Sequence, residues 1–418
     1  MSKWTKYRVD EIAKKTGIGP FGSRMKSDTY TQSGVPVIRG TNITGGRSFS
    51  GEWVYVSERD ADQLSSCNVR EGDLVFPHRG SIGEVGIVPG DRERYLLSSS
   101  LMSLKCDETK ADSLYLYYFF KSNEGRHQLL KNASQVGTPG IGQPLRSLRS
   151  IELYLPPVEQ QKDIATMLGC LDDKIELNRR MNESLEAMAR AIFQSWFVDF
   201  DPVRAKASGE SVDSICQRLG LTPELLALFP DSFEDSELGE IPTGWLPTRL
   251  DNVLELAYGK ALKATDRIVG EIPVYGSGGV TGYHHESLID GPTIIVGRKG
   301  TVGSLYWEDR SSYPIDTVFY VKPKLELTYC LYLLQTLALE TMNTDAAVPG
   351  LNRNNVYRLL TSLPDEKLRA AFNRLAMVVR SQMRAITEEL KTLSEVRDTL
   401  LPTLLSGSLV VSARENLS

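Results

Sequence analysis

Residues 153–202 read LYLPPVEQQKDIATMLGCLDDKIELNRRMNESLEAMARAIFQSWFVDFDP and predict one long helix. Pro156 and Pro157 mark its start, because proline fits the first turn of a helix and breaks its interior. Asp201-Pro202 marks its end. About forty residues at roughly 1.5 Å each give a rod of about 60 Å, which is longer than one compact domain needs.

Along this helix the seam residues alternate at spacings of four and three, which is typical of a helix that packs along a second helix. The seam comprises Ile164, Leu168, Leu171, Ile175, Asn178, Asn182, Leu185, Ala189, Ile192 and Trp196. A second helix is predicted over 365–401, with the seam Leu368, Phe372, Leu375, Val379, Gln382, Ile386, Glu389, Leu393, Val396 and Leu400. We expect the two helices to pair antiparallel, and the polar seam residues to fix their register.

The two halves of the chain repeat one plan. Pro36-Val37 corresponds to Pro273-Val274, RGSIG (79–83) to KGTVG (299–303), and Leu155-Pro156 to Leu363-Pro364. The offset between the repeats falls from 237 to 208, as expected when loops differ on a shared framework. The predicted fold is therefore mixed α/β (α+β), with two similar globular units, two long antiparallel coiled-coil helices and a pseudo-two-fold internal repeat.

The pattern of strands, helices and loops divides the chain into six segments. They are a first globular unit (1–155), a central spacer helix (156–200), a polar acidic connector (201–236), a second globular unit (237–362), a distal spacer helix (363–406) and a tail (407–418). In the first unit we predict strands at 35–40, 53–56 and 73–76 and a helix over 111–131. Further helices are predicted after the cap Thr222 and across 327–342.

The composition is that of an ordinary globular protein. The 418 residues are 41% hydrophobic and 24% charged, and five scattered cysteines without a CxxC pair argue against disulfides or a zinc site. The net charge is −5, but residues 157–241 hold 17 acidic and 8 basic residues, so the remainder is mildly basic. No stretch resembles a signal peptide or a membrane span, and we expect a cytoplasmic protein.

Motifs spread along nearly the whole chain resemble the specificity subunits of type I restriction-modification systems, usually called HsdS. They are the central stretch 155–202, PFGSRMKSDTY (20–30), VPVIRGTNI (35–43), LGEIPTGW (238–245), YGKALKA (258–264), IPVYGSGGV (272–280), VGRKGTVGS (296–304) and AVPGLNRN (347–354). The chain departs from the family at SLPDEKLRAAFNRL (362–375), which lacks the usual glutamate-glutamine pair after the prolines.

The resemblance implies that each globular unit is a target recognition domain that reads one half of a bipartite, asymmetric DNA site. It implies that the helices set the gap between the half-sites and that two methyltransferase and two restriction subunits dock on the chain. S-adenosylmethionine, ATP and Mg²⁺ would then belong to the partner subunits. The whole complex would serve host defence by methylating DNA or cutting it.

The basic, glycine-spaced turns are the first candidates for DNA contact, because glycine lets the backbone approach and the neighbouring side chains bind phosphates or base edges. The candidates in these turns are His78, Arg79 and Ser81 in the first unit and Arg298, Lys299 and Thr301 in the second. Further candidates are Arg24, Lys26, Arg39, Lys260, Lys263, Arg267, His284 and Asn354. The alternative for each is a solvated surface residue, and the loops 135–144 and 346–355 have the alternative role of linking each unit to its helix.

Four aromatic residues crowd the end of the central helix: Phe193, Trp196, Phe197 and Phe200. Such a cluster fits either the centre of a partner interface or packing of the helix against the second unit. Both alternatives remain open from the sequence.

We expect no catalysis by this chain. It has no phosphate-binding loop of the GxxxxGK[ST] type, and no Asn/Asp-Pro-Pro-aromatic sequence of the kind that amino-methyltransferases carry. With four histidines and no ligand spacing, no metal is expected either. Three hypotheses follow: a type I specificity subunit, a bipartite DNA-binding protein that acts without methyltransferase partners, and an enzyme with an unrecognised active site.

Overall fold

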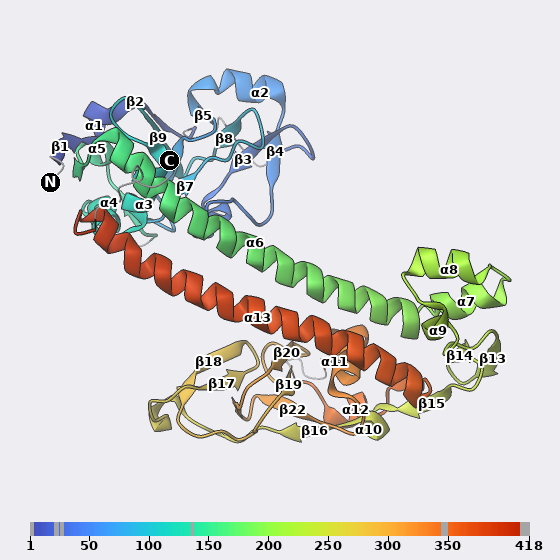
Figure 1. Cartoon of the computed structure of the whole chain (residues 1–418). Helices are drawn as coiled ribbons and strands as arrows, with labels where there is room; N and C mark the ends of the chain where they lie inside the picture. Colours follow the sequence, from blue (N-terminus) through green and yellow to red (C-terminus); the bar gives the residue numbers. More distant parts are fainter. Residues whose placement is uncertain (1–3, 21–24, 26–28, 135–137, 344–349, 410–418) are drawn as a thin grey trace, which may run out of the picture. The chain divides into compact units, whose positions relative to one another are not determined.

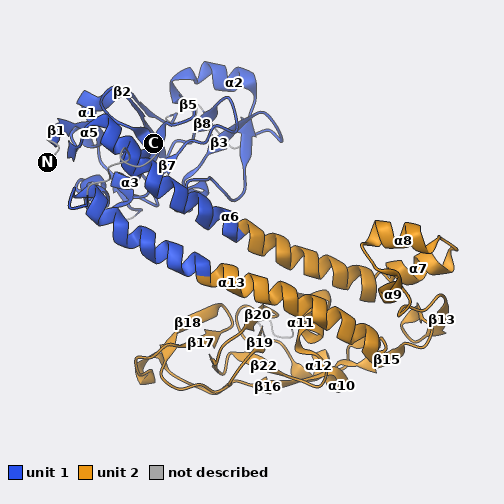
Figure 2. Cartoon of the chain, in the orientation of Figure 1, with its two compact units in different colours: residues 1–179, 389–418 blue, residues 180–388 orange. Residues whose placement is uncertain are grey.

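The computed structural model describes residues 4–20, 25, 29–134, 138–343 and 350–409, and Figure 1 traces the elements in chain order. The chain divides into two compact units, which Figure 2 colours separately. Unit 1 comprises residues 1–179 and 389–418, and unit 2 comprises residues 180–388. Each long helix therefore contributes one end to each unit.

Two four-stranded sheets form the globular part of unit 1, in the orders β2-β9-β6-β7 and β4-β3-β8-β5. The strands are β2 (Ala13–Ile18), β3 (Val35–Ile38), β4 (Val54–Val56), β5 (Asn68–Val69), β6 (Leu74–Pro77), β7 (Gly86–Ile87), β8 (Tyr95–Leu97) and β9 (Leu101–Cys106). The strands predicted at 35–40, 53–56 and 73–76 are confirmed as β3, β4 and β6. A separate pair, β1 (Thr5–Arg8) and β12 (Glu152–Leu155), is antiparallel and precedes the central helix.

Short helices cover the sheets of unit 1. They are α1 (Val9–Ile12), α2 (Glu58–Gln63), α3 (Ser113–Lys121), α4 (Asn123–Leu130) and α5 (Pro144–Arg149), with the small strand pair β10 (Ala133–Ser134) and β11 (Gly140–Ile141) before α5. The single helix predicted over 111–131 is wrong, because Ser122 ends α3 and caps α4 by accepting the amide proton of Gly125. A Cβ at Gly125 would lie 2.0 Å from the Phe119 carbonyl oxygen, so this close turn needs glycine.

Unit 2 repeats the topology of unit 1. Its sheets have the orders β16-β22-β19-β20 and β18-β17-β21, and β15 pairs with β23 as β1 pairs with β12. The strands are β15 (Leu246–Arg249), β16 (Leu254–Tyr258), β17 (Ile272–Gly276), β18 (Gly279–His284), β19 (Thr293–Gly297), β20 (Leu305–Glu308), β21 (Tyr313–Pro314), β22 (Val318–Pro323) and β23 (Leu360–Leu363). The helices are α10 (Leu250–Val253), α11 (Leu327–Thr336) and α12 (Arg353–Tyr357). The predicted internal repeat is confirmed.

The acidic segment that follows the central helix is folded rather than extended. It contains α7 (Asp201–Ala207), α8 (Val212–Leu219), α9 (Pro223–Leu226) and the strand pair β13 (Phe233–Ser236) and β14 (Gly239–Pro242). Thr222 caps α9 as predicted. The side chains of Val203, Ile215 and Phe229 are at most 2% exposed and belong to the core of unit 2, so this segment is anchored by apolar burial.

The long helices are α6 (Val158–Phe197) and α13 (Glu366–Leu405), each of 40 residues. Both follow a proline, and the stretch just before Pro156 is strand β12 rather than helix. The helical pattern predicted over 365–401 ends before the observed end at Leu405, which lies inside the spacer segment predicted over 363–406. The helix continues through Pro402, which has no amide proton to donate but whose carbonyl still accepts from the amide of Ser406 at 3.0 Å.

Within each unit a stretch of α6 runs antiparallel to a stretch of α13. In unit 1 Asp172 pairs with Arg397 at 3.0 Å, and the later residue Lys174 pairs with the earlier Glu389 at 3.3 Å. In unit 2 Asn182 donates to Thr387 at 3.2 Å, and Glu186 pairs with Arg380 at 3.1 Å. The predicted antiparallel pairing is thus confirmed inside both units.

Most seam residues are buried or half-buried. These are Ile164, Leu168, Leu171, Ile175, Leu185, Ile192, Phe372, Leu375, Val379, Ile386 and Leu393. Asn178 is 1% exposed and donates to Glu389 at 2.9 Å, and this hydrogen bond lowers the pKa of Glu389. Val396 is 42% exposed, because its neighbour Arg397 turns toward α6 instead. Among the described residues, no helix is both long and apolar enough to cross a membrane.

Candidate nucleic-acid interface

In unit 1 the basic turn after β6 is bonded to the loop that precedes α5. The amide of Ile141 donates to the carbonyl of His78 at 2.9 Å, and the amide of Gly80 donates to the carbonyl of Pro139 at 3.0 Å. Gly80 and Gly83 have φ angles of 80° and 86°, a region that favours glycine. The turn therefore keeps a tight backbone shape and presents the exposed side chains of Arg79 and Ser81.

The turn after β19 in unit 2 has the same arrangement. The amide of Leu351 donates to the carbonyl of Arg298 at 2.8 Å, and Lys299 forms an isolated bridge with Gly350. A Cβ at Gly303 would lie 2.4 Å from the amide nitrogen of Glu340, so the turn fits closely against the segment after α11. In both units the structure brings together a basic turn and a later loop, two features that the sequence predicts separately.

Two arginines and a tyrosine form the centre of the unit 2 surface. The guanidinium carbons of Arg298 and Arg353 lie 5.2 Å and 4.9 Å from the ring centre of Tyr258, in cation–π contact. Arg298 also donates to the carbonyl of Asp316 at 2.8 Å. With Lys299 and Asn354 these residues line a cavity of about 350 Å³. The result is a polar, positively charged hollow beside the turn.

Arg353 and Tyr258 are not among the residues predicted from the sequence to contact DNA. Tyr258 lies in the family motif YGKALKA and Arg353 in AVPGLNRN. The sequence signals that could have identified them are an aromatic residue close to a lysine and an arginine between two asparagines. Their contact depends on the pairing of β16 with β22, which brings Tyr258 opposite Phe319 and places its ring near the turn. That pairing is not readable from either motif alone.

The equivalent position in unit 1 is occupied by His78, and here the prediction of a DNA contact is corrected. His78 is 5% exposed, and its Nε2 is 3.1 Å from the carbonyl of Ser99. Burial lowers the pKa of His78, so the imidazole stays neutral near neutral pH. A hollow of about 350 Å³ in unit 1 is lined by residues of the later loop and α5, including Gln143 and Arg146.

The remaining predicted DNA contacts divide into three groups. Lys260, Lys263, Thr301 and Asn354 are exposed. Arg39 donates to the carbonyl of Glu52, and Arg267 donates to the carbonyl of Thr281 at 2.7 Å, so both guanidinium groups hold loops within their own unit. Arg24 and Lys26 lie outside the described residues, as do parts of the loops 135–144 and 346–355.

His284 does not reach the surface, and its prediction as a DNA contact is also corrected. The side chain is 5% exposed, its Nδ1 accepts from the amide of Ile268 at 3.0 Å, and its ring packs edge-on against Tyr313. Among the described residues, His284, His285 and Glu286 form one group whose potential metal-ligand atoms lie within 4.8 Å of one another. Because Nδ1 of His284 already accepts a hydrogen bond, that group offers a poor ligand set.

The aromatic cluster at the end of α6 is core, and its assignment to a partner interface is corrected. Phe193, Trp196, Phe197 and Phe200 are 1%, 3%, 4% and 9% exposed. The ring centres of Phe193 and Phe197 lie 5.3 Å and 5.4 Å from that of Phe372 on α13. The alternative of packing within the second unit is therefore correct, since an interface residue has to be accessible.

Comparison with known proteins finds a matching family model and related proteins. A family model described as the type I restriction modification DNA specificity domain matches residues 1–187 and 242–359. The HindI specificity subunit of Haemophilus influenzae is 25% identical and aligns over 98% of this chain and 100% of that protein. The MjaIX specificity subunit of Methanocaldococcus jannaschii is 23% identical over 98% of this chain and 94% of that protein.

A solved structure has the same fold. The S subunit of a type I restriction-modification system from M. genitalium aligns over 96% of each chain with a TM-score of 0.59 and 19% sequence identity. The two matched family regions include the repeated globular sheets, which carry the basic turns described above, and the first region extends into α6. The chain belongs to the family of type I restriction-modification DNA specificity subunits.

Proposed function

We propose that this specificity subunit reads a bipartite, asymmetric DNA site, with one half-site bound by each unit. The observation that carries the proposal is the repeated surface: in both units a basic glycine turn is bonded to a later loop, at 2.9 Å in unit 1 and 2.8 Å in unit 2. Such surfaces combine cations for phosphates with amides and arginines for base edges.

The two surfaces share a backbone frame but differ in side chains, which supports an asymmetric site. Buried, neutral His78 stands where unit 2 has Arg298 in contact with Tyr258. Exposed Arg79 and Lys299 occupy matching positions, and Arg binds guanine or phosphate through two donors where Lys acts as a point charge. The two half-sites are therefore expected to differ in sequence.

The gap between the half-sites is set, in this proposal, by α6 and α13. Each helix has 40 residues and is about 60 Å long. Two units that read the same face of B-DNA are centred about one turn, roughly 10 bp, apart. A paired helix of fixed register is a suitable ruler, because its length does not vary once its seam is packed.

Two methyltransferase and two restriction subunits are proposed to dock on this chain. Exposed apolar side chains on α6 support a partner surface different from the aromatic cluster. In unit 1 these are Met167 and Leu177, 37% and 53% exposed, and in unit 2 Met181 and Met188, 42% and 46% exposed. The chain itself is proposed to be non-catalytic and cytoplasmic, with S-adenosylmethionine, ATP and Mg²⁺ held by its partners.

The first test maps methylated bases in cells that express this chain with its cognate methyltransferase. Arg79→Ala should weaken or relax only the first half-site, and Lys299→Ala only the second, each by about 1–3 kcal/mol if the side chain reads a base. Lys162→Ala and Lys367→Ala, exposed lysines on α6 and α13, are the matched controls. Equal loss at both half-sites from Lys299→Ala would contradict the assignment of one half-site per unit.

A second test shortens the ruler. Removal of residues 176–182 from α6 together with 385–391 from α13 keeps the heptad seam and shortens each helix by about 10 Å. The expected motif keeps both half-sites and loses up to about 3 bp from the gap. Retention of the original gap would rule out the helices as the ruler, and DNA binding without any methylation would favour the protein that acts without methyltransferase partners.

A further inference from the structure

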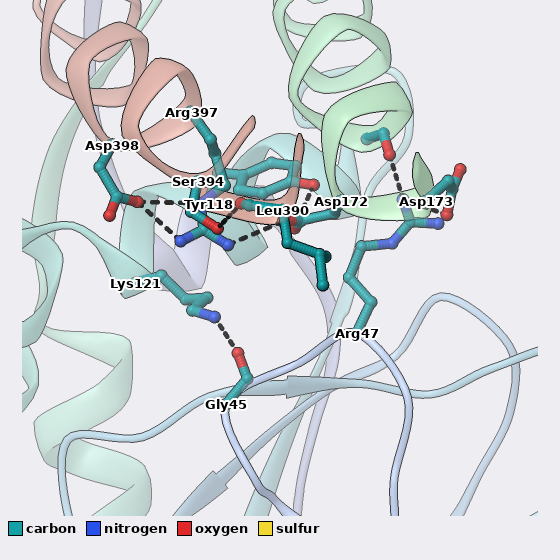
Figure 3. Close-up of polar contacts among 11 residues, drawn as sticks. Gly45, Arg47, Tyr118, Lys121, Asp172, Asp173, Leu390, Ser394, Arg397 and Asp398 are labelled. Atoms are coloured by element: carbon teal, nitrogen blue, oxygen red, sulfur yellow. Dashed lines mark hydrogen bonds and ion pairs between the residues drawn. The ribbon is translucent and has the colours of Figure 1, made fainter. Parts of the chain in front are cut away.

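In unit 1 one carboxylate joins the recognition domain to both long helices. Figure 3 shows Tyr118 of α3, Asp172 of α6 and Arg397 of α13 meeting at this point. The hydroxyl of Tyr118 donates to Oδ2 of Asp172 at 2.8 Å, and Nη1 of Arg397 lies 3.0 Å from Oδ1. Burial and the carboxylate of Asp172 raise the pKa of Tyr118, so the hydroxyl stays a donor.

Unit 2 contains a matching cluster. Glu186 of α6 accepts from Nε2 of Gln335 at 2.9 Å and pairs with Nη2 of Arg380 on α13 at 3.1 Å. The hydroxyl of Tyr332 on α11 lies 3.5 Å from the same carboxylate. Arg380 also lies over the ring of Trp307, 4.9 Å from its centre. We call the two clusters the unit 1 lock (Tyr118, Asp172, Arg397) and the unit 2 lock (Tyr332, Glu186, Arg380).

The locks occupy equivalent places in the repeat. Tyr118 and Tyr332 stand at the same position of α3 and α11, three residues after the matched tyrosines Tyr115 and Tyr329. Asp172 and Arg380 are separated by 208 residues, the same offset that separates Leu155-Pro156 from Leu363-Pro364 at the two helix starts. This pair of equivalent positions thus carries opposite charges, while Glu186 and Arg397 lie 211 residues apart, within one helical turn of equivalence.

The charge pattern is consequently not symmetric even though the fold repeats. In both units the acid belongs to α6 and the arginine to α13. We propose that this polarity selects the pairing of α6 with α13 and opposes pairing of like helices between two copies of the chain. The proposal concerns helix pairing and does not depend on how the units read DNA.

Like-helix pairing would bring equal charges together. If two copies of α6 paired with the geometry that α6 and α13 have in one chain, Asp172 of one copy would face Glu186 of the other. In an α13–α13 pair, Arg380 of one copy would face Arg397 of the other. These side chains are only 11–25% exposed, so water screens their repulsion poorly. Juxtaposed like charges at such sites act against the wrong partner.

A third ion pair between the helices has the opposite polarity. Lys174 on α6 pairs with Glu389 on α13 at 3.3 Å. The side chains of this pair are 44% and 45% exposed, and exposed pairs contribute little because water and salt screen them. The less exposed locks are therefore expected to contribute more to the preference than this pair does.

The test uses two full-length copies of the chain with different tags, expressed together. The measured quantity is the fraction of one copy captured through the tag of the other, together with the mass of the purified species. The key variant reverses the unit 1 lock alone, by Asp172→Arg with Arg397→Asp. Within one chain both locks remain matched, but like helices can now also pair with opposite charges facing. We expect cross-capture to rise by about tenfold or more.

The matched control reverses both locks, adding Glu186→Arg with Arg380→Glu. The lock residues on α6 are then both arginines and those on α13 are both acids. Like helices therefore repel again, and cross-capture should return to the wild-type value. If the locks only stabilised their own units, cross-capture would rise more in the variant with four substitutions than in the variant with two. Thermal unfolding of each variant shows whether the lock still forms.

Two results would overturn the proposal. One is wild-type cross-capture by the chain with only one reversed lock, and the other is equally high cross-capture by the chain with both locks reversed. If the unit 1 reversal fails to fold, the reversal of the unit 2 lock alone carries the same expectation, because it produces the same mixed charge pattern on each helix.

Discussion

Units 1 and 2 share the order of their first sheet but differ in the second, which has four strands in unit 1 and three in unit 2 and is connected differently. In unit 1 residues 39–53 form a long connection between β3 and β4, whereas in unit 2 only residues 277–278 join β17 to β18. The long connection is tied down: Arg47 donates to the carbonyl of Gly169 on α6 at 3.0 Å, and Lys121 of α3 donates to the carbonyl of Gly45 (Figure 3).

Unit 2 reaches the long helices by another route. Trp307 of β20 packs under Arg380 of α13, and Phe372 of the same helix is surrounded by aromatic rings, including Phe193 and Tyr332. Besides the lock that each unit has, unit 1 therefore uses hydrogen bonds from a loop, and unit 2 uses edge-to-face aromatic contacts. The shared framework thus determines where each unit contacts its helices, while the residues that make these contacts differ between the units.

The largest effect is expected at the aromatic contact. Phe372→Ala should lower the free energy of unfolding of unit 2 by about 3–5 kcal/mol, because a fully buried ring is lost. Ile164, 208 residues earlier on α6 and also 0% exposed, is the matched position in unit 1. Hydrogen exchange of peptides from each unit measures the result, and equal loss of protection in both units after Phe372→Ala would contradict the assignment.

The tyrosines of the two locks should respond differently. Tyr118→Phe removes a 2.8 Å hydrogen bond to a carboxylate and should cost about 1–2 kcal/mol. Tyr332→Phe removes only a 3.5 Å contact, and Gln335 and Arg380 still satisfy Glu186. Its expected cost is below about 0.5 kcal/mol. Chemical denaturation of both variants checks this order, and a larger loss from Tyr332→Phe would refute it.

Loss of the loop contact in unit 1 should have a smaller, local effect. Arg47→Ala removes the bonds to Gly169 and Asp173, and because the arginine is 30% exposed the cost should be about 1 kcal/mol. Faster hydrogen exchange is expected in residues 39–53 and not in the sheets. Arg70→Ala, at an exposed ion pair with Glu93, serves as the control and should leave the loop unchanged.

The smallest effect is the pH dependence that buried His78 contributes to unit 1. Burial lowers the pKa of His78 below its ordinary value of 6.5, so between those two values the unfolded chain binds more protons than the folded chain. The stabilisation that depends on neutral His78 is therefore fully present above pH 6.5, and it declines as the pH falls toward the pKa of His78 in the folded chain. At the matching place unit 2 has Arg298 rather than a histidine. His78→Gln should remove the unit 1 dependence in pH-resolved hydrogen exchange.

Several features of the fold could be predicted because they depend on local patterns. The long helices follow from their seams, and the repeat follows from short matched motifs such as RGSIG and KGTVG. The split of the helix over 111–131 could not be predicted, because the strong apolar pattern of α3 hides the cap at Ser122. The helices α7 and α8 were missed because their segment is acidic, and only burial of residues such as Val203 reveals their packing.

The candidate interface was predicted in part. The sequence identifies the basic turns, since glycine and cation spacing is a local signal. It cannot show that His78 and His284 are buried while Arg353 joins the surface, because exposure depends on residues more than 20 positions away, such as Ser99 for His78 and Leu256 for Arg353.

The sequence by itself determined the two-unit plan, the antiparallel helices and the family, because heptad spacing and repeated motifs are properties of the chain alone. Only the tertiary structure decided which side chains are available to a partner. The aromatic cluster of α6 became core, and the two locks became visible, since both depend on which distant residues the packed helices bring within contact distance.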